Sequence, residues 1–159
     1  MYFRDLSLYS YSTKSPLPDV LNVGWLDRSI PFSRGTVPSR FVDQLKKWFR
    51  VARVNQMRGI HECNFCRAEQ WPPLPVKDHP SLTIENRIFA LGSKEIWIPG
   101  PNGKIFASPA LVIHYVEVHE YCPPEEFIAA VMDDESMSKW NAEAESVTRT
   151  RGTRDGVRV

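Results

Sequence analysis

Two short motifs contain the side chains best suited to bind a metal ion. Cys63 and Cys66 are separated by two residues, a spacing at which one tight turn aims both sulfurs at the same ion. His114 and His119 are separated by four residues, within the range of three to five that zinc-finger histidine pairs show. Two thiolates and two imidazoles form a common tetrahedral zinc set. The sequence therefore predicts one zinc ion bound by Cys63, Cys66, His114 and His119.

Helix geometry sets a condition on the histidine pair. Five residues of ideal α-helix turn through about 500°, which leaves the two rings about 140° apart. Both rings can reach one ion only if the helix tightens or ends near His119. Pro123 and Pro124 follow soon afterwards, and they favour such an end because proline cannot continue a helix.

Other side chains near these motifs leave alternatives open. His61 and Cys122 are reserve ligands, and either could replace a histidine. A complete set of four protein ligands makes the ion structural, because a catalytic zinc keeps one position for water. If one histidine lay elsewhere, Glu62 or Glu117 could act as a general base beside a zinc-bound water. His79, in a proline-rich loop, is expected to be an exposed residue rather than a general base.

Helices must position the second motif. Apolar residues at helical spacing predict a first helix over residues 38–53, with Thr36 or Ser39 as its N-cap. A second helix carries the histidines, and Ser108-Pro109 is expected to open it as N-cap and first helical residue. A third helix is predicted over residues 123–132.

Strands are expected between the two motifs. Segments 82–91, 94–98 and 104–107 have the composition of strands joined by turns. Asn102-Gly103 is the strongest hairpin signal in the chain. The expected fold is α+β, with a small antiparallel sheet packed on two or three helices around a zinc-finger-like metal site.

The length of 159 residues is that of a single domain. We expect one zinc-binding domain over residues 1–135, followed by a poorly structured extension over residues 136–159. The end of that extension, residues 149–159, contains four arginines and is expected to be a disordered basic tail.

Charge and hydropathy disfavour several classes of function. The net charge is +1, from 20 basic and 19 acidic residues, so no global field draws the chain to nucleic acid or a membrane. No segment approaches the roughly 18 apolar residues of a membrane span, and the first residues do not resemble a signal peptide. With three cysteines, an odd number, we expect a cytoplasmic protein with reduced thiols. One local basic cluster, on the first helix and just after it, is either a solvated face or a partner surface: Lys46, Lys47, Arg50, Arg53 and Arg58.

Several segments together resemble a known kind of protein. They are the opening Met1-Tyr2-Phe3-Arg4-Asp5-Leu6-Ser7, the turn His61-x-Cys63-x-x-Cys66 and the segment from His114 to Pro124. In this combination the chain is similar to a family of small uncharacterised bacterial proteins over residues 1–132. The resemblance implies a bacterial, cytoplasmic, metal-binding domain and carries no activity with it.

The chain contains no complete catalytic set. The G-x-S-x-G elbow, the P-loop and the G-x-G-x-x-G fingerprint are all missing from the sequence. We therefore expect a zinc-stabilised bacterial binding module, an accessory, immunity or regulatory protein that docks on a protein partner. The alternatives are a zinc-dependent hydrolase or nuclease and, less favoured, a DNA-binding regulator that uses the basic helix.

Overall fold

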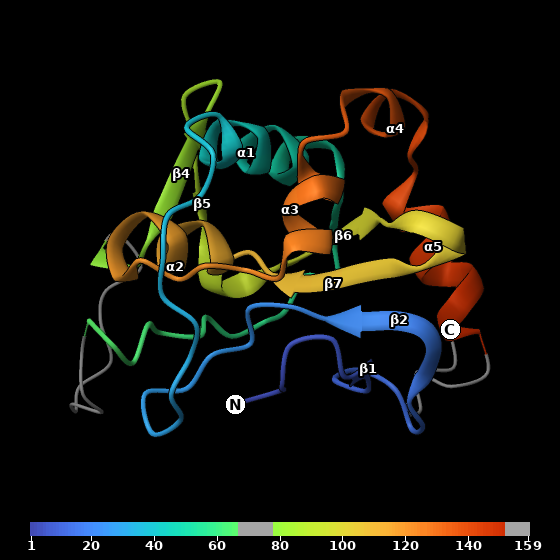
Figure 1. Cartoon of the computed structure of the whole chain (residues 1–159), viewed down its shortest axis with the longest axis horizontal. Coiled ribbons are helices and arrows are strands. Elements are labelled where there is room, and N and C mark those ends of the chain that lie inside the picture. Colours follow the sequence, from blue (N-terminus) through green and yellow to red (C-terminus); the bar gives the residue numbers. More distant parts are fainter. Residues whose placement is uncertain (67–77, 152–159) are drawn as a thin grey trace.

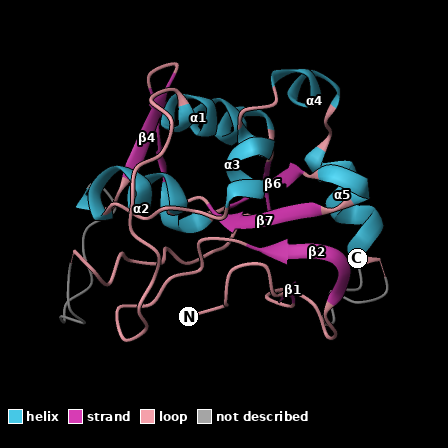
Figure 2. Ribbon diagram, in the orientation of Figure 1, coloured by secondary structure: helices cyan, strands magenta, loops and turns pink. Residues whose placement is uncertain are grey.

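The computed structural model describes residues 1–66 and 78–151. This part of the chain forms a five-stranded sheet, a separate two-stranded hairpin and five α-helices. Strand order in the larger sheet is β1-β2-β7-β6-β3. In the view of Figure 1, α1 and α3 lie on one side of β6 and β7, while β1 and β2 extend the sheet on the other side. The predicted α+β class is correct (Figure 2).

The larger sheet is mixed rather than antiparallel. Strand β7 (Ile105–Pro109) pairs antiparallel with β6 (Glu95–Pro99) and parallel with β2 (Leu17–Asn22). Strands β1 (Leu8–Tyr9) and β3 (Arg53–Val54) form the two edges, both antiparallel to their neighbours. The expectation of an antiparallel sheet is wrong at β2–β7. A parallel pair needs a long crossover, and the chain between these strands includes α1.

The predicted turn between β6 and β7 is confirmed. Asn102 and Gly103 have φ angles of 56° and 76°, and the N–H of Lys104 donates to the carbonyl of Pro101 at 3.1 Å. Left-handed backbone at both central positions is the geometry of a type I′ hairpin turn.

The predicted strand over residues 82–91 divides into two. Strands β4 (Ser81–Ile84) and β5 (Arg87–Ala90) form an antiparallel hairpin of their own. Glu85 and Asn86 connect them with φ angles of 48° and 61°. The sequence pattern did not predict this turn, because glutamate, at its first central position, is not one of the residues that indicate left-handed backbone.

Helix α1 (Phe41–Val51) lies within the predicted range of 38–53 and buries the expected apolar face. Arg40 is its N-cap, without a side-chain hydrogen bond, so the predicted caps Thr36 and Ser39 are wrong. The indole N–H of Trp48 donates to the carbonyl of Val131 at 2.9 Å. This bond fixes α1 against the end of α3.

Helix α2 (Val112–His119) begins later than predicted. Ser108 and Pro109 belong to β7, where Ser108 is fully buried and pairs with Ile96. Serine followed by proline is therefore a strand end here and not a helix cap. Helix α3 (Glu125–Val131) agrees with the prediction, with two glutamates in its first turn, where a negative charge opposes the helix dipole.

The C-terminal residues are more ordered than expected. Helices α4 (Asp134–Lys139) and α5 (Ala142–Thr150) cover most of the segment from residue 136 to 150, so the predicted poorly structured extension is wrong there. Asp133 and Asn141 cap the two helices through their side chains, and α5 packs on β3 and β6. Residues 152–159, with the last two arginines of the predicted tail, lie outside the described residues. None of the described helices is long and apolar enough to cross a membrane.

Candidate metal centre

The two cysteines and two histidines predicted as ligands come together at one point. The Sγ atom of Cys63 lies 3.2 Å from Nε2 of His119, and Sγ of Cys66 lies 3.2 Å from Nε2 of both His114 and His119. All four ligand atoms lie within 4.8 Å of one another. A tetrahedral zinc, with bonds of about 2.3 Å to sulfur and about 2.0 Å to nitrogen, separates such atoms by about 3.5 Å. The cluster is therefore of a size to hold one metal ion.

The end of α2 brings the two histidines together. The helix stops at His119, and Glu120 has a left-handed φ of 58°. The N–H groups of Glu120 and Tyr121 both donate to the carbonyl of Tyr115, which widens the last turn. The centroids of the rings of His114 and His119 lie only 5.0 Å apart. The structure thus meets the condition that helix geometry placed on this pair.

Glu120 is strained where glycine is the usual residue. Its ion pair with Arg34 spans 3.7 Å between side chains that are 78% and 58% exposed, and such pairs contribute little. We expect Glu120→Gly to raise the melting temperature by about 3 °C, because relief of the left-handed strain exceeds the entropy that glycine adds to the unfolded chain. Thermal unfolding of the metal-loaded protein measures this. Glu120→Gln removes the charge but keeps the strain, so a glycine variant no more stable than the glutamine variant would contradict the explanation.

Backbone hydrogen bonds hold the cysteine turn in place. The N–H of Met57 donates to the carbonyl of Ser93 at 2.8 Å, and the N–H of His61 donates to that of Gly92 at 2.9 Å. A Cβ atom on Gly92 would lie 2.0 Å from the carbonyl oxygen of His61. Gly92 therefore permits the close approach that positions the turn. Sequence reasoning missed it, although an isolated glycine beside a strand is a signal of close backbone approach.

The cysteine turn also packs directly on the histidine helix. The ring of Phe65, between the two cysteines, lies 5.7 Å from the ring of Tyr115 and 5.2 Å from that of His119. The contact places an apolar residue of the turn against α2, so the four ligands are held by packing as well as by hydrogen bonds.

Burial affects the protonation of the cluster. Cys63 is buried, Cys66 is exposed, and His114 and His119 are partly buried. Burial raises the pKa of the Cys63 thiol to about 11, although backbone N–H groups oppose the rise. Burial also lowers the pKa of both histidines, which favours the neutral imidazole that binds metals. The thiols must lose protons to bind a metal, so binding is coupled to proton release.

The two reserve ligands lie outside the cluster. Nε2 of His61 shares a hydrogen bond of 3.0 Å with the hydroxyl of Tyr11. The Sγ atom of Cys122 lies 3.8 Å from the carbonyl oxygen of Thr36. The metal-binding group in the described part of the chain contains neither residue.

The carboxylates considered as general bases have other partners. Glu117 forms an ion pair of 2.5 Å with Lys46, and Glu62 lies 4.0 Å from Nε2 of His79. His79 is only 6% exposed, so the expectation of an exposed loop histidine is wrong. The chain from His79 leads directly into β4, and the N–H of Leu91 anchors it by donating to the carbonyl of Pro80.

Two members of the predicted basic cluster contact other residues of the same domain. Lys46 is paired with Glu117, while the guanidinium of Arg53 lies over the rings of Phe89 and Phe49, 4.6 and 5.2 Å from their centroids. Two of its five charges are therefore engaged within the domain.

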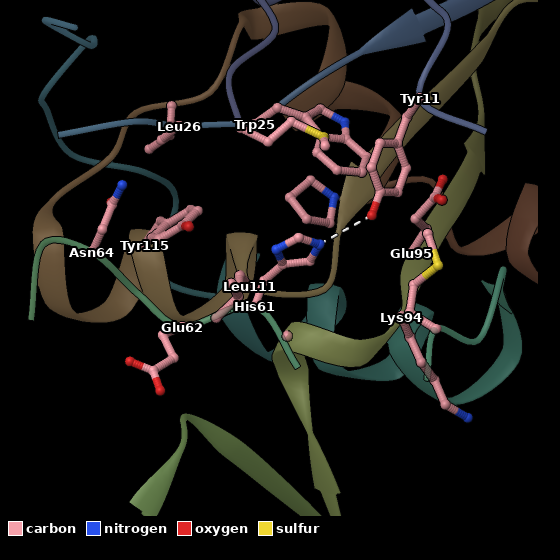
Figure 3. Close-up of a pocket in the computed structure, with 14 residues that line it drawn as sticks. Tyr11, Trp25, Leu26, His61, Glu62, Asn64, Lys94, Glu95, Leu111 and Tyr115 are labelled. Carbon is pink, nitrogen blue, oxygen red and sulfur yellow. Dashed lines mark hydrogen bonds between the residues drawn. The ribbon is translucent and has the colours of Figure 1, made fainter. Parts of the chain in front are cut away.

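A cavity of about 60 Å³ is lined in part by residues of the cysteine turn and of α2 (Figure 3). Three aromatic residues, Tyr11, Trp25 and Tyr115, contribute to its lining. Asn64 and Tyr115, which adjoin predicted metal ligands in the sequence, also line it. The cavity and the metal centre thus share the cysteine turn and α2.

Fold and site define a mixed α+β domain with a Cys₂His₂ cluster that could hold a metal ion. The chain belongs to the DUF7919 family, described as a domain of unknown function, which matches residues 1–132. This is consistent with the uncharacterised family that the sequence resembles. The match ends just before α4, so α4 and α5 follow the family domain. No curated protein and no solved structure shows significant similarity to the chain.

Proposed function

We propose that this chain is a zinc-stabilised binding module in which the ion joins the cysteine turn to the end of α2. The observation that supports it is the meeting of four ligand atoms within 4.8 Å, although residues 67–113 separate the two motifs. Sulfur and imidazole ligands favour zinc over magnesium or calcium, which prefer oxygen. The ion joins distant parts of the chain, as structural zinc does.

The contacts favour a structural ion over a catalytic one. Four protein ligands complete a tetrahedral shell and leave no position for water. The ion pair of Glu117 with Lys46 also occupies one of the two carboxylates that could serve as a base. A zinc-dependent hydrolase or nuclease is therefore the less supported candidate. The engagement of Lys46 and Arg53 within the domain likewise weakens the case for a DNA-binding regulator.

We propose a protein partner for this module, which would act as an accessory, immunity or regulatory protein in the reducing bacterial cytoplasm, where thiols remain available for metal. The support is one exposed apolar side chain on an element that stands apart from the main sheet. Ile88, in the β4–β5 hairpin, is 68% exposed. Short exposed strands are common sites of protein contact.

Metal analysis tests the site. Protein purified without added metal is expected to carry about one zinc per chain, and the X-ray absorption edge is expected to show two sulfur and two nitrogen ligands. Fewer protein ligands together with an oxygen would favour the hydrolase. Protein free of metal would contradict the proposed site.

Affinity capture from cells tests the binding role. Ile88→Lys is expected to lose the partners that the wild-type protein retains, because a charge replaces the exposed apolar side chain. Val147→Lys is the matched control, since Val147 is 54% exposed on α5. Equal partner recovery by both variants would remove the hairpin from the proposal.

A further inference from the structure

The cavity that shares the cysteine turn with the metal centre has an aromatic lining. In Figure 3 the side chains of Tyr115, Trp25 and Tyr11 lie around the ring of His61, which also lines the cavity, with Leu26 on one side and Leu111 below. The rings come from three separate parts of the chain: α2, the segment after β2 and the segment after β1. Such a lining offers several ring faces and apolar side chains to one small ligand.

The rings of Trp25 and Tyr11 are held in place by other contacts. The indole N–H of Trp25 donates to the carbonyl of Ala107 at 3.0 Å. The ring of Tyr11 packs on that of Trp25 at 4.6 Å, and its hydroxyl is hydrogen-bonded to His61. This part of the cavity is therefore formed before a ligand arrives, which lowers the entropic penalty of binding.

Tyr115 differs from the other buried tyrosines. The hydroxyl of Tyr9 is bonded to Glu95, and that of Tyr121 is bonded to Asp5. Tyr115 is only 4% exposed, and its hydroxyl has no hydrogen-bond partner within residues 1–66 and 78–151. The hydroxyl oxygen is not one of the fully enclosed polar atoms that lack a partner in this part of the chain, so it can donate a hydrogen bond to water or to a ligand.

The charges around the cavity favour a cation. Glu95 lines it, and so does Glu62, although Figure 3 shows the Glu62 carboxylate directed away from the aromatic rings. Met1 also lines the cavity, and its terminal ammonium lies 3.8 Å from the carboxylate of Asp27, which offsets its charge. Glu95 is 1% exposed, and the neutral side chains of Tyr9, Asn55 and Trp97 donate hydrogen bonds to its carboxylate. The ammonium of Lys94, which also lines the cavity, lies 5.5 Å from the centroid of the Phe89 ring. Figure 3 shows it directed away from the aromatic rings as well.

We propose that this cavity binds a small organic cation with an alkylated ammonium head, such as a trimethylammonium group. Aromatic faces attract a cation of this kind through their negative quadrupole. Its methyl groups suit the apolar contacts that Leu26 and Leu111 provide, and the buried carboxylate of Glu95 disfavours an anion. The inference goes beyond the proposed function, because it requires no protein partner. It requires only the cysteine turn, which supplies one wall.

Paired titrations test the charge requirement. Choline and its neutral carbon analogue, 3,3-dimethylbutan-1-ol, have nearly the same shape and differ in the charge of the head. Isothermal titration calorimetry of the full-length, metal-loaded protein is expected to show choline binding at least about tenfold more tightly. Equal affinities, or no binding of choline by protein with its full metal content, would overturn the proposal.

Substitution of one ring tests the location. Tyr11→Leu is expected to weaken choline binding about tenfold, because it removes an aromatic face from the cavity. Tyr2→Leu is the matched control, since Tyr2 is an exposed tyrosine before β1 and does not line the cavity. If Tyr11→Leu fails to fold, Glu62→Gln replaces it and is expected to weaken choline about threefold by removing a lining charge. Unchanged affinity in a folded variant would place the site elsewhere.

Melting temperature and metal content are measured for each protein. Choline binding by a protein that lacks zinc would contradict the proposed metal site and leave the cation site standing. Full zinc content without choline binding would contradict the cation site and leave the proposed metal site standing.

Discussion

Cys63→Ser is expected to abolish metal binding and with it the cooperative fold. Cys63 is 3% exposed, and its sulfur lies at the meeting point of the cysteine turn and α2. A structural zinc contributes on the order of 10 kcal/mol to folding, which is comparable with the whole net stability of about 5–15 kcal/mol of a typical domain. The apo-protein should therefore be largely unfolded at 25 °C. Circular dichroism and metal content measure the effect, and chelation of the wild-type protein should reproduce it.

Cys122→Ser is the control for the loss of a thiol. Cys122 lies outside the metal-binding group, so this variant should retain its metal and melt within about 2 °C of the wild-type protein. A Cys63→Ser protein that binds no metal yet melts at the wild-type temperature would show that the ion does not stabilise the fold.

Gly92→Ala is expected to have the second largest effect. The added Cβ would lie 2.0 Å from the carbonyl oxygen of His61, 2.9 Å from its carbonyl carbon and 3.0 Å from its nitrogen. These are backbone atoms, so no side chain can rotate to relieve the clash. The segment that carries Cys63 must move, which breaks the bond from the His61 N–H to the Gly92 carbonyl. We expect a loss of about 3 kcal/mol, measured by urea unfolding, and a lower affinity for zinc, measured against a competing chelator.

Gly59, in the segment that carries His61, provides the matched control. A Cβ atom there meets nothing within 4 Å, and Gly59 is not among the residues with positive φ. Gly59→Ala should change stability by no more than about 0.5 kcal/mol. If both alanine variants behaved alike, the close approach at Gly92 would not be what positions the turn.

Local spacing was sufficient to find the candidate metal centre. Each half, Cys63 with Cys66 and His114 with His119, lies within a few residues of sequence, and the chemistry of zinc limits which spacings are useful. The same holds for the turn at Asn102-Gly103, where two residues determine the backbone angles. The two ligand pairs and this turn each depend on a few neighbouring residues, and they depend little on the rest of the fold.

Features that depend on tertiary packing could not be predicted in this way. Ser108-Pro109 fits a helix start as well as a strand end, and only the pairing with β6 decides between them. Helix α5 buries small residues, Ala142, Ser146 and Thr150, which an apolar-periodicity search does not detect. The aromatic lining of the cavity comes from three segments that are distant in sequence, so no short motif predicts it.

The parallel pairing of β2 with β7 has a consequence for the order of folding. Val20 pairs with Ile105, a separation of 85 positions (105 − 20), whereas β6 and β7 are joined by a tight turn. Long-range pairings close large loops and form slowly, while hairpins form in microseconds. During synthesis the N-terminal strand leaves the ribosome long before its partner exists. Strand β2 can pair with β1 at once, but its other edge must remain unpaired until the β6–β7 hairpin has formed.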